Sequence, residues 1–129
     1  MDNLSLAQEW FRLAQMDFDS ANHLLTMHPI PIEIICYHCQ QSAEKYLKGY
    51  LVFQGVIPPK THDLDELCKS CNGFSDKFIE IADYCSDLTA YGVQPRYPME
   101  LYLEEQDVHQ SLKSAKAIKD FVLNLVPDI

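Results

Sequence analysis

Apolar residues recur at three- and four-residue steps through most of the chain, which is the spacing of amphipathic helices. Five such runs span about 5–27, 32–54, 63–71, 74–91 and 104–125, and no run shows the sustained alternation that predicts a strand. The helical spacing and the lack of strand signals predict an all-α fold. Because the connectors are short, we predict an up-and-down antiparallel helical bundle of four longer helices plus one short helix. The recurring positions of the first run are Leu6, Trp10, Leu13, Ala14, Asp17, Ala21, Leu24 and Leu25.

Capping residues, prolines and glycines mark the ends of these helices. Asn3 or Ser5 is the expected N-cap of the first helix, and the prolines of His28-Pro29-Ile30-Pro31 end it. Gly55 is expected to end the second helix and Gly92 the fourth. With 129 residues, the chain is long enough for one hydrophobic core and short for two, so we predict a single domain over residues 1–129.

The formal net charge of −9, from 19 acidic and 10 basic residues, restricts the function. A field of that sign repels phosphate backbones, so we predict no broad nucleic-acid surface, and any phosphate recognition must be local. No stretch approaches the roughly 20 apolar residues of a membrane-spanning helix. The N-terminal sequence does not resemble a secretory signal, and five cysteines are an odd number, so we predict a cytoplasmic protein with reduced thiols.

The second predicted helix separates into an apolar face and a polar stripe. Its apolar face comprises Cys36, Cys39, Ala43, Leu47 and Tyr50. The stripe comprises His38, Gln41, Lys45 and Lys48. Two interpretations stay open for the stripe. It is either a solvated face with ordinary pairing to Glu44 one turn away, or one wall of a polar cleft that accepts a phosphate or a partner's carboxylates.

The cysteines are arranged in a pattern that also occurs in zinc sites. Cys36-x-x-Cys39 is followed by Cys68-x-x-Cys71, and four thiolates in two pairs can bind zinc. The two pairs are further apart than in the usual zinc ribbon, and the first pair lies on the apolar face of a helix. We therefore predict that these thiols, and Cys85 on the apolar stripe of the fourth helix, pack in the core, with no metal and no cofactor bound.

One short motif precedes the short third predicted helix, and another precedes the last predicted helix. Asp63 followed by Glu66 is similar to a capping box and Thr61 is a second candidate cap, so we predict a structural role for Thr61, His62 and Asp63. Near position 96, two prolines bracket Arg96-Tyr97 in the one irregular stretch of any length. An arginine there suits bidentate phosphate contact and a tyrosine suits base stacking, but a local salt bridge and a packed ring explain them equally well.

Taken together, three segments resemble the prokaryotic HEPN domain (higher eukaryotes and prokaryotes nucleotide-binding). They are CYHCQQSAEKYLK at 36–48, PKTHDL at 59–64 and RYP at 96–98, and the resemblance extends over nearly the whole chain. It implies a helical bundle that commonly forms homodimers. It also implies that the domain is paired with, or fused to, a minimal nucleotidyltransferase in a toxin–antitoxin-like system.

Some members of that family are metal-independent ribonucleases with an arginine separated by four to six residues from a histidine. The chain has two arginines, Arg12 and Arg96, and neither is followed by a histidine at this spacing. The resemblance therefore does not lead us to predict ribonuclease activity for this chain.

The resemblance and the residues together predict a nucleotide-associated binding or partner module without catalysis of its own. Its candidate nucleotide contacts are His38, Gln41, Lys45, Lys48, Arg96 and Tyr97. One alternative is a ribonuclease toxin with an atypical site drawn from His38, His62 and Arg96. A second is a structural adaptor without a ligand.

Overall fold

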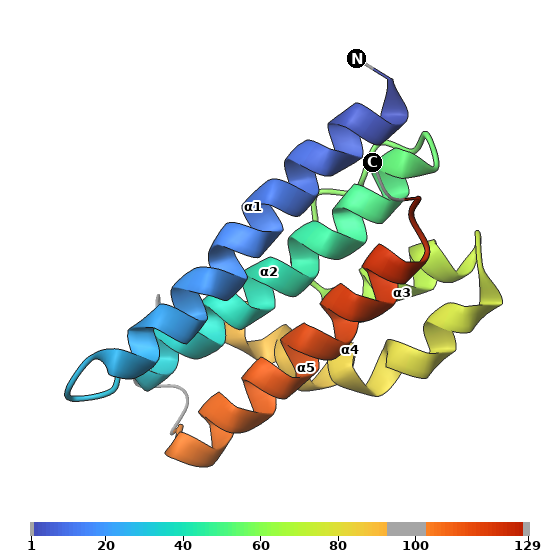
Figure 1. Cartoon of the computed structure of the whole chain (residues 1–129). Helices are drawn as coiled ribbons and strands as arrows, with labels where there is room; N and C mark the ends of the chain where they lie inside the picture. The colour runs from blue at the N-terminus through green and yellow to red at the C-terminus, as the bar shows by residue number, and fades with distance from the viewer. Residues whose placement is uncertain (1, 93–102, 128–129) are drawn as a thin grey trace.

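The chain folds into a bundle of α-helices, and its computed structural model describes residues 2–92 and 103–127 (Figure 1). The helices are α1 (Asn3–His23), α2 (Ile32–Phe53), α3 (Leu64–Asn72), α4 (Ala82–Thr89) and α5 (Glu105–Asn124). The described residues contain no strand, so the all-α prediction is confirmed. Within these residues, no helix is both long enough and apolar enough to span a bilayer.

The centre of the bundle is α2, which packs against α1 on one side and α5 on the other. In Figure 1, α1 runs antiparallel to α2, while α5 lies beside α2 and runs in the same direction. The α3–α4 pair covers the remaining side of α2 and returns the chain to the start of α5. As a result, 13 of the 22 residues of α2 are buried, polar ones included.

The predicted start of the first helix was wrong by a residue or more. Neither Asn3 nor Ser5 is the N-cap of α1. That position is Asp2, whose carboxylate accepts a hydrogen bond from the Ser5 backbone N–H at 2.7 Å. A carboxylate at this position also interacts favourably with the positive end of the helix dipole. Gly55 ends α2 as expected, with a φ of 83° that favours glycine.

The predicted fourth helix is divided into three pieces. A 3₁₀ helix, η2 (Asp76–Ile81), precedes α4, and a second one, η3 (Ala90–Gly92), follows it. Ser75 is extended and its hydroxyl accepts from the Lys77 N–H, so the α-helix does not begin at Phe74. Phe78 and Ile81 are both buried, and the three-residue period of a 3₁₀ helix places them on the same face. This segment therefore contributes only an eight-residue α-helix.

Gly49 allows α1 and α2 to approach each other closely. A Cβ at this position would lie 2.6 Å from Phe11 Cε1 and 3.0 Å from Trp10 Cβ, and both residues belong to α1. The Phe11 ring is itself stacked on Tyr46, with 5.7 Å between the ring centroids, so it cannot move aside freely. Only glycine fits at this helix crossing without displacing α1.

We expect Gly49→Ala to destabilise the fold. Alanine has a higher helix propensity than glycine, but its overpacking against Phe11 outweighs this gain. The free energy of unfolding should fall by about 1–2 kcal/mol. Thermal unfolding followed by circular dichroism measures the effect. Gly73→Ala is the matched control, because its new Cβ meets only the Ser70 carbonyl oxygen at 3.3 Å. Equal melting temperatures for Gly49→Ala and the wild type would contradict a tight crossing.

Candidate functional site

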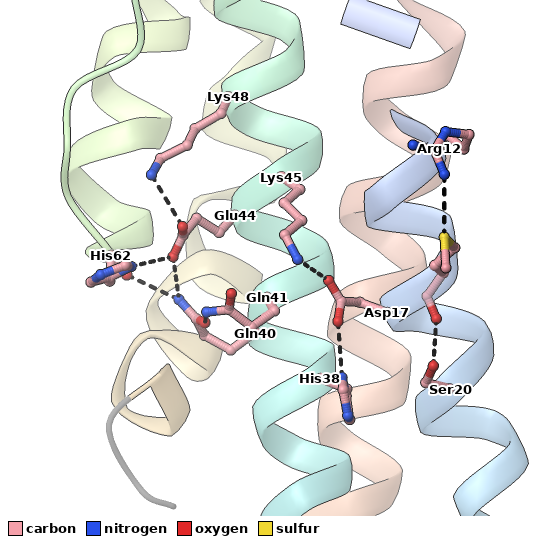
Figure 2. A network of polar contacts seen from close by, with 11 residues as sticks. Arg12, Asp17, Ser20, His38, Gln40, Gln41, Glu44, Lys45, Lys48 and His62 are labelled. Carbon is pink, nitrogen blue, oxygen red and sulfur yellow. Dashed lines mark hydrogen bonds and ion pairs between the residues drawn. The ribbon is translucent and has the colours of Figure 1, made fainter. Parts of the chain in front are cut away.

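Two carboxylates on different sides of α2 each hold one lysine and one histidine (Figure 2). Asp17, on α1, accepts from His38 Nδ1 at 2.9 Å and from Lys45 Nζ. Glu44, on α2 itself, binds Lys48 Nζ at 3.1 Å and His62 Nδ1 at 2.9 Å. We call these groups the Asp17 cluster (Asp17, His38, Lys45) and the Glu44 cluster (Glu44, Lys48, His62, with Gln40 and Gln41).

The Asp17 cluster lies at the α1–α2 boundary and is partly open to solvent. The side chains of His38 and Lys45 are 28% and 25% exposed, while that of Asp17 is 13% exposed. Asp17 thus fixes the two donor groups and leaves other N–H groups of the lysine free to bind a ligand. His38 also lines an open pocket of about 460 Å³ near the C-terminal end of α1, together with Ser20 and His23.

The ion pair of the Glu44 cluster is much more buried. The side chains of Glu44 and Lys48 are 6% and 10% exposed, so their ion pair is largely removed from water. Gln40 Nε2 donates to the His62 carbonyl oxygen at 3.0 Å and to Glu44 Oε1 at 3.3 Å, and Gln41 Nε2 donates to Gln40 Oε1 at 2.7 Å. The buried Glu44 and Lys48 charges require these ionic and hydrogen-bonding partners, because a buried charge without them lowers the stability of the fold.

Gly92 packs directly on the Glu44 cluster. A Cβ there would lie 3.0–3.2 Å from the side-chain amide of Gln40. The last described residue before the 93–102 segment therefore contacts the middle of α2. Arg96 and Tyr97 lie outside the described residues.

The predicted polar stripe is divided between these two clusters. His38 and Lys45 turn toward α1, whereas Gln41 and Lys48 join the Glu44 cluster (Figure 2). Pairing of Lys48 with Glu44 one turn away was one of the two interpretations, but the pair is buried rather than solvated. Sequence reasoning missed Asp17 as the partner. An acid within the apolar repeat of the first helix was the available signal.

The Thr61-His62-Asp63 segment joins the start of α3 to α2. Asp63 is the N-cap of α3, and its Oδ1 accepts from the Asp65 N–H at 2.9 Å. Thr61 Oγ1 accepts from the Asp63 N–H at 3.1 Å. The His62 ring, with 63% of its side chain exposed, reaches back to Glu44. Two adjacent residues therefore have different structural roles: Asp63 caps α3, and His62 attaches the start of α3 to α2.

The cysteines pack as apolar side chains. All five are buried, and Cys36 Sγ accepts from the Ser111 hydroxyl while Cys71 Sγ donates to the Leu47 carbonyl oxygen at 3.6 Å. Burial raises the pKa of Cys36 to about 11, which opposes the thiolate form that binds zinc. Among residues 2–92 and 103–127, no group of three or more His, Cys, Asp or Glu side chains is placed to hold a metal ion.

Comparisons with known proteins agree with this fold. A family model described as the HEPN domain matches residues 7–125. A protein of Methanocaldococcus jannaschii described as "Putative toxin MJ1304" is 26% identical over 93% of this chain and 90% of its own length. Two crystal structures have the same fold. TT1696 from Thermus thermophilus has a TM-score of 0.82 at 21% identity, covering 93% of this chain and 98% of that one. ST0689, described as an archaeal HEPN homologue, has a TM-score of 0.73 at 24% identity, covering 94% and 98%.

We expect Glu44→Gln to destabilise the fold by about 3 kcal/mol, because it leaves the buried Lys48 ammonium without its counter-charge. Adding Lys48→Met should recover most of this loss, since the double variant removes both charges. Chemical denaturation of the four proteins of this cycle measures the coupling. Asp120→Asn, which breaks the exposed Lys116–Asp120 pair with the same i,i+4 spacing, is the control and should cost less than about 0.5 kcal/mol. A Glu44→Gln loss as small as the control's would contradict the buried pair.

Proposed function

The chain belongs to the HEPN domain family, and within that family we propose that it is a cytoplasmic binding and partner module of a toxin–antitoxin-like pair. Its partner in this proposal is a minimal nucleotidyltransferase, and its ligand is a nucleotide. The relative described as a toxin supports the toxin side of such a pair, because the alignment covers nearly the full length of both chains. The sequence supports binding rather than RNA cleavage, because neither Arg12 nor Arg96 has a histidine at the family's nuclease spacing.

The observation that carries the nucleotide proposal is the Asp17 cluster. It holds an ammonium and an imidazole, both partly exposed, at the two oxygens of one carboxylate on a chain whose overall charge is −9. A protein of that charge cannot attract a nucleic-acid backbone over a wide surface, but two fixed donors suit one phosphate group. Lys45 and His38 are therefore the proposed phosphate contacts.

The other candidate contacts have different places in this proposal. The Lys48 ammonium is bound to Glu44 and largely buried, so it acts by fixing the Glu44 cluster rather than by reaching a ligand. Gln41 is also bonded within that cluster, and its side chain is half-buried. For Arg96 we still predict a further phosphate contact, and for Tyr97 we still predict stacking on a base.

A second candidate function is metal-independent RNA cleavage, and the His38–Asp17 contact favours it. A histidine held by a carboxylate is a common arrangement for an acid or base. His62 has a similar contact with Glu44, but the two histidines bond to different carboxylates on different sides of α2 (Figure 2). Each would have to act without the other.

We expect Lys45→Met to weaken nucleotide binding about tenfold, the effect of losing one charged hydrogen bond. Calorimetric titration with ATP and GTP measures it. Lys116→Met is the matched control, since Lys116 is also paired with an aspartate but lies on the exposed face of α5. Equal affinities for the wild type and both variants would remove the Asp17 cluster as the nucleotide site. RNA cleavage in EDTA that His38→Ala abolishes would replace the proposal with the ribonuclease.

The homodimer expected of this family is proposed to use the outer face of α1. Three large apolar side chains there, Leu6, Leu13 and Met16, are 41%, 40% and 55% exposed. We expect Leu13→Glu to convert a dimer into a monomer, because it places a charge in the buried interface. Size-exclusion chromatography with light scattering measures the mass. Ile79→Glu, at an apolar residue that is 76% exposed on η2, is the control and should stay dimeric. A wild-type protein that is monomeric at high concentration would contradict this interface.

A further inference from the structure

The protonation of His38 decides what the Asp17 cluster offers to a ligand. His38 Nδ1 lies 2.9 Å from Asp17 Oδ1, and Lys45 Nζ bonds to the other oxygen of the same carboxylate. A carboxylate paired with an ammonium is ionised and only accepts hydrogen bonds, so His38 Nδ1 carries a hydrogen and donates it. In a neutral imidazole the second nitrogen, Nε2, then has a lone pair and no hydrogen. Neutral His38 therefore has no N–H group left for a phosphate oxygen.

The second ring nitrogen of His38 is on the open side of the cluster. Nε2 points away from Asp17 (Figure 2), and the His38 side chain is 28% exposed. The ring also lines the open pocket of about 460 Å³ near the C-terminal end of α1. A ligand at this side of the ring meets an acceptor when His38 is neutral and a donor when His38 is protonated.

The charge of the cluster leads to the same requirement. One carboxylate balances one ammonium, so Asp17 and Lys45 together are neutral, on a chain whose overall charge is −9. A phosphate monoester carries nearly two negative charges at neutral pH, because its second pKa is about 6. This dianion has no hydrogen to donate to Nε2, and it finds no net positive charge until the imidazole is protonated. A nearby anion favours the protonated form of a histidine.

We propose that the Asp17 cluster selects terminal phosphate monoesters, and that one proton is taken up from the solvent between His38 Nε2 and a phosphate oxygen when the nucleotide binds. This inference rests on the proposed nucleotide site and specifies its ligand. A phosphodiester carries one negative charge, so it draws the proton less strongly than a dianion does. A nucleotide with a terminal phosphate therefore binds more tightly than a diester of the same nucleoside.

In this arrangement Asp17 is the residue that determines specificity. It cancels the charge that Lys45 would otherwise offer to any anion, and it occupies the one N–H group of neutral His38. Weak attraction of singly charged anions is the consequence, because the site becomes cationic only when a ligand stabilises the imidazolium. A lysine and a histidine without the aspartate would bind diesters and monoesters with little distinction.

The affinity for a monoester should have a maximum close to neutral pH. As the pH rises, the imidazole loses its proton and the affinity falls. As the pH falls below about 6, the phosphate becomes a monoanion and the affinity falls again. The other titratable groups around His38 come from α1 and α2. They are Asp17, Asp19, His23, Tyr37 and Lys45. Of these side-chain types, only histidine ordinarily changes its charge in this pH range, so His23 needs a control.

Calorimetric titration of the whole chain with 5′-AMP and with 3′,5′-cyclic AMP tests the proposal, because the two ligands share adenosine and differ in monoester against diester. At about pH 7.5 we expect 5′-AMP to bind at least about tenfold more tightly. Its binding heat should differ between Tris and HEPES buffers by an amount that corresponds to the uptake of more than about half a proton. Equal affinities for the two ligands, or 5′-AMP heats that are the same in both buffers, would overturn the proposal.

Two glutamine variants locate the proton. His38→Gln retains an amide that can donate to Asp17 but cannot take up a proton, so the buffer dependence should disappear and the preference for 5′-AMP should fall to less than about threefold. His23→Gln is the matched control and should retain the proton uptake, because His23 has no bond to Asp17 among the described contacts. Proton uptake that persists in His38→Gln, or that is lost in His23→Gln, would contradict the assignment. The wild-type titrations decide the proposal even where a variant does not fold.

The same titrations separate this inference from the proposed function. Lys45→Met should weaken the binding of 5′-AMP if the Asp17 cluster is the nucleotide site. Weakened binding in Lys45→Met together with no proton uptake in the wild type would leave the nucleotide site in place and overturn the selection of monoesters. Absence of binding of either ligand to the wild type would overturn the proposed nucleotide site itself.

Discussion

The close contact between α1 and α2 at Gly49 is the constraint on which the rest of the structure depends. Without a side chain at Gly49, the Phe11 ring and the Trp10 Cβ of α1 come against α2. Two turns further along α1, the same contact brings Asp17 within bonding distance of His38 and Lys45. A wider separation of the two helices would leave the carboxylate and its partners in water. An exposed pair of this kind contributes little to stability and does not fix the position of a donor.

Because α2 packs against helices on several sides, some of its polar residues are removed from water. Each charge that becomes buried needs a counter-charge, and the chain supplies one carboxylate for each side of α2. Asp17 comes from the neighbouring helix and stays near the surface, whereas Glu44 comes from α2 itself and is buried. The difference in burial decides what each cluster can do. The Asp17 cluster keeps its lysine and histidine partly open to solvent, whereas the Glu44 cluster attaches His62, and with it α3, to α2.

The sequence predicted the helices well because helix formation leaves a local and periodic signal. The ends of α2, α3 and α5 agree with the predicted ends to within a residue or two. The division of the 74–92 segment was missed, because 3₁₀ and α-helical spacing of Phe78, Ile81 and Cys85 look alike in so short a run. The clusters were also beyond local reasoning. Asp17 bonds to a lysine 28 positions later and Glu44 to a histidine 18 positions later, and only tertiary packing brings them together.

The short helix α3 connects the Glu44 cluster to α4. It begins after Asp63, directly beside the His62 ring that binds Glu44, and it carries Cys68 in its second turn. The Asp65–Ser86 hydrogen bond holds this same helix against α4. Asp63 and His62 are adjacent, so the residue that caps α3 and the residue that bonds to Glu44 are positioned together. The short helix is thus attached to α2 at its start and to α4 in its first turn.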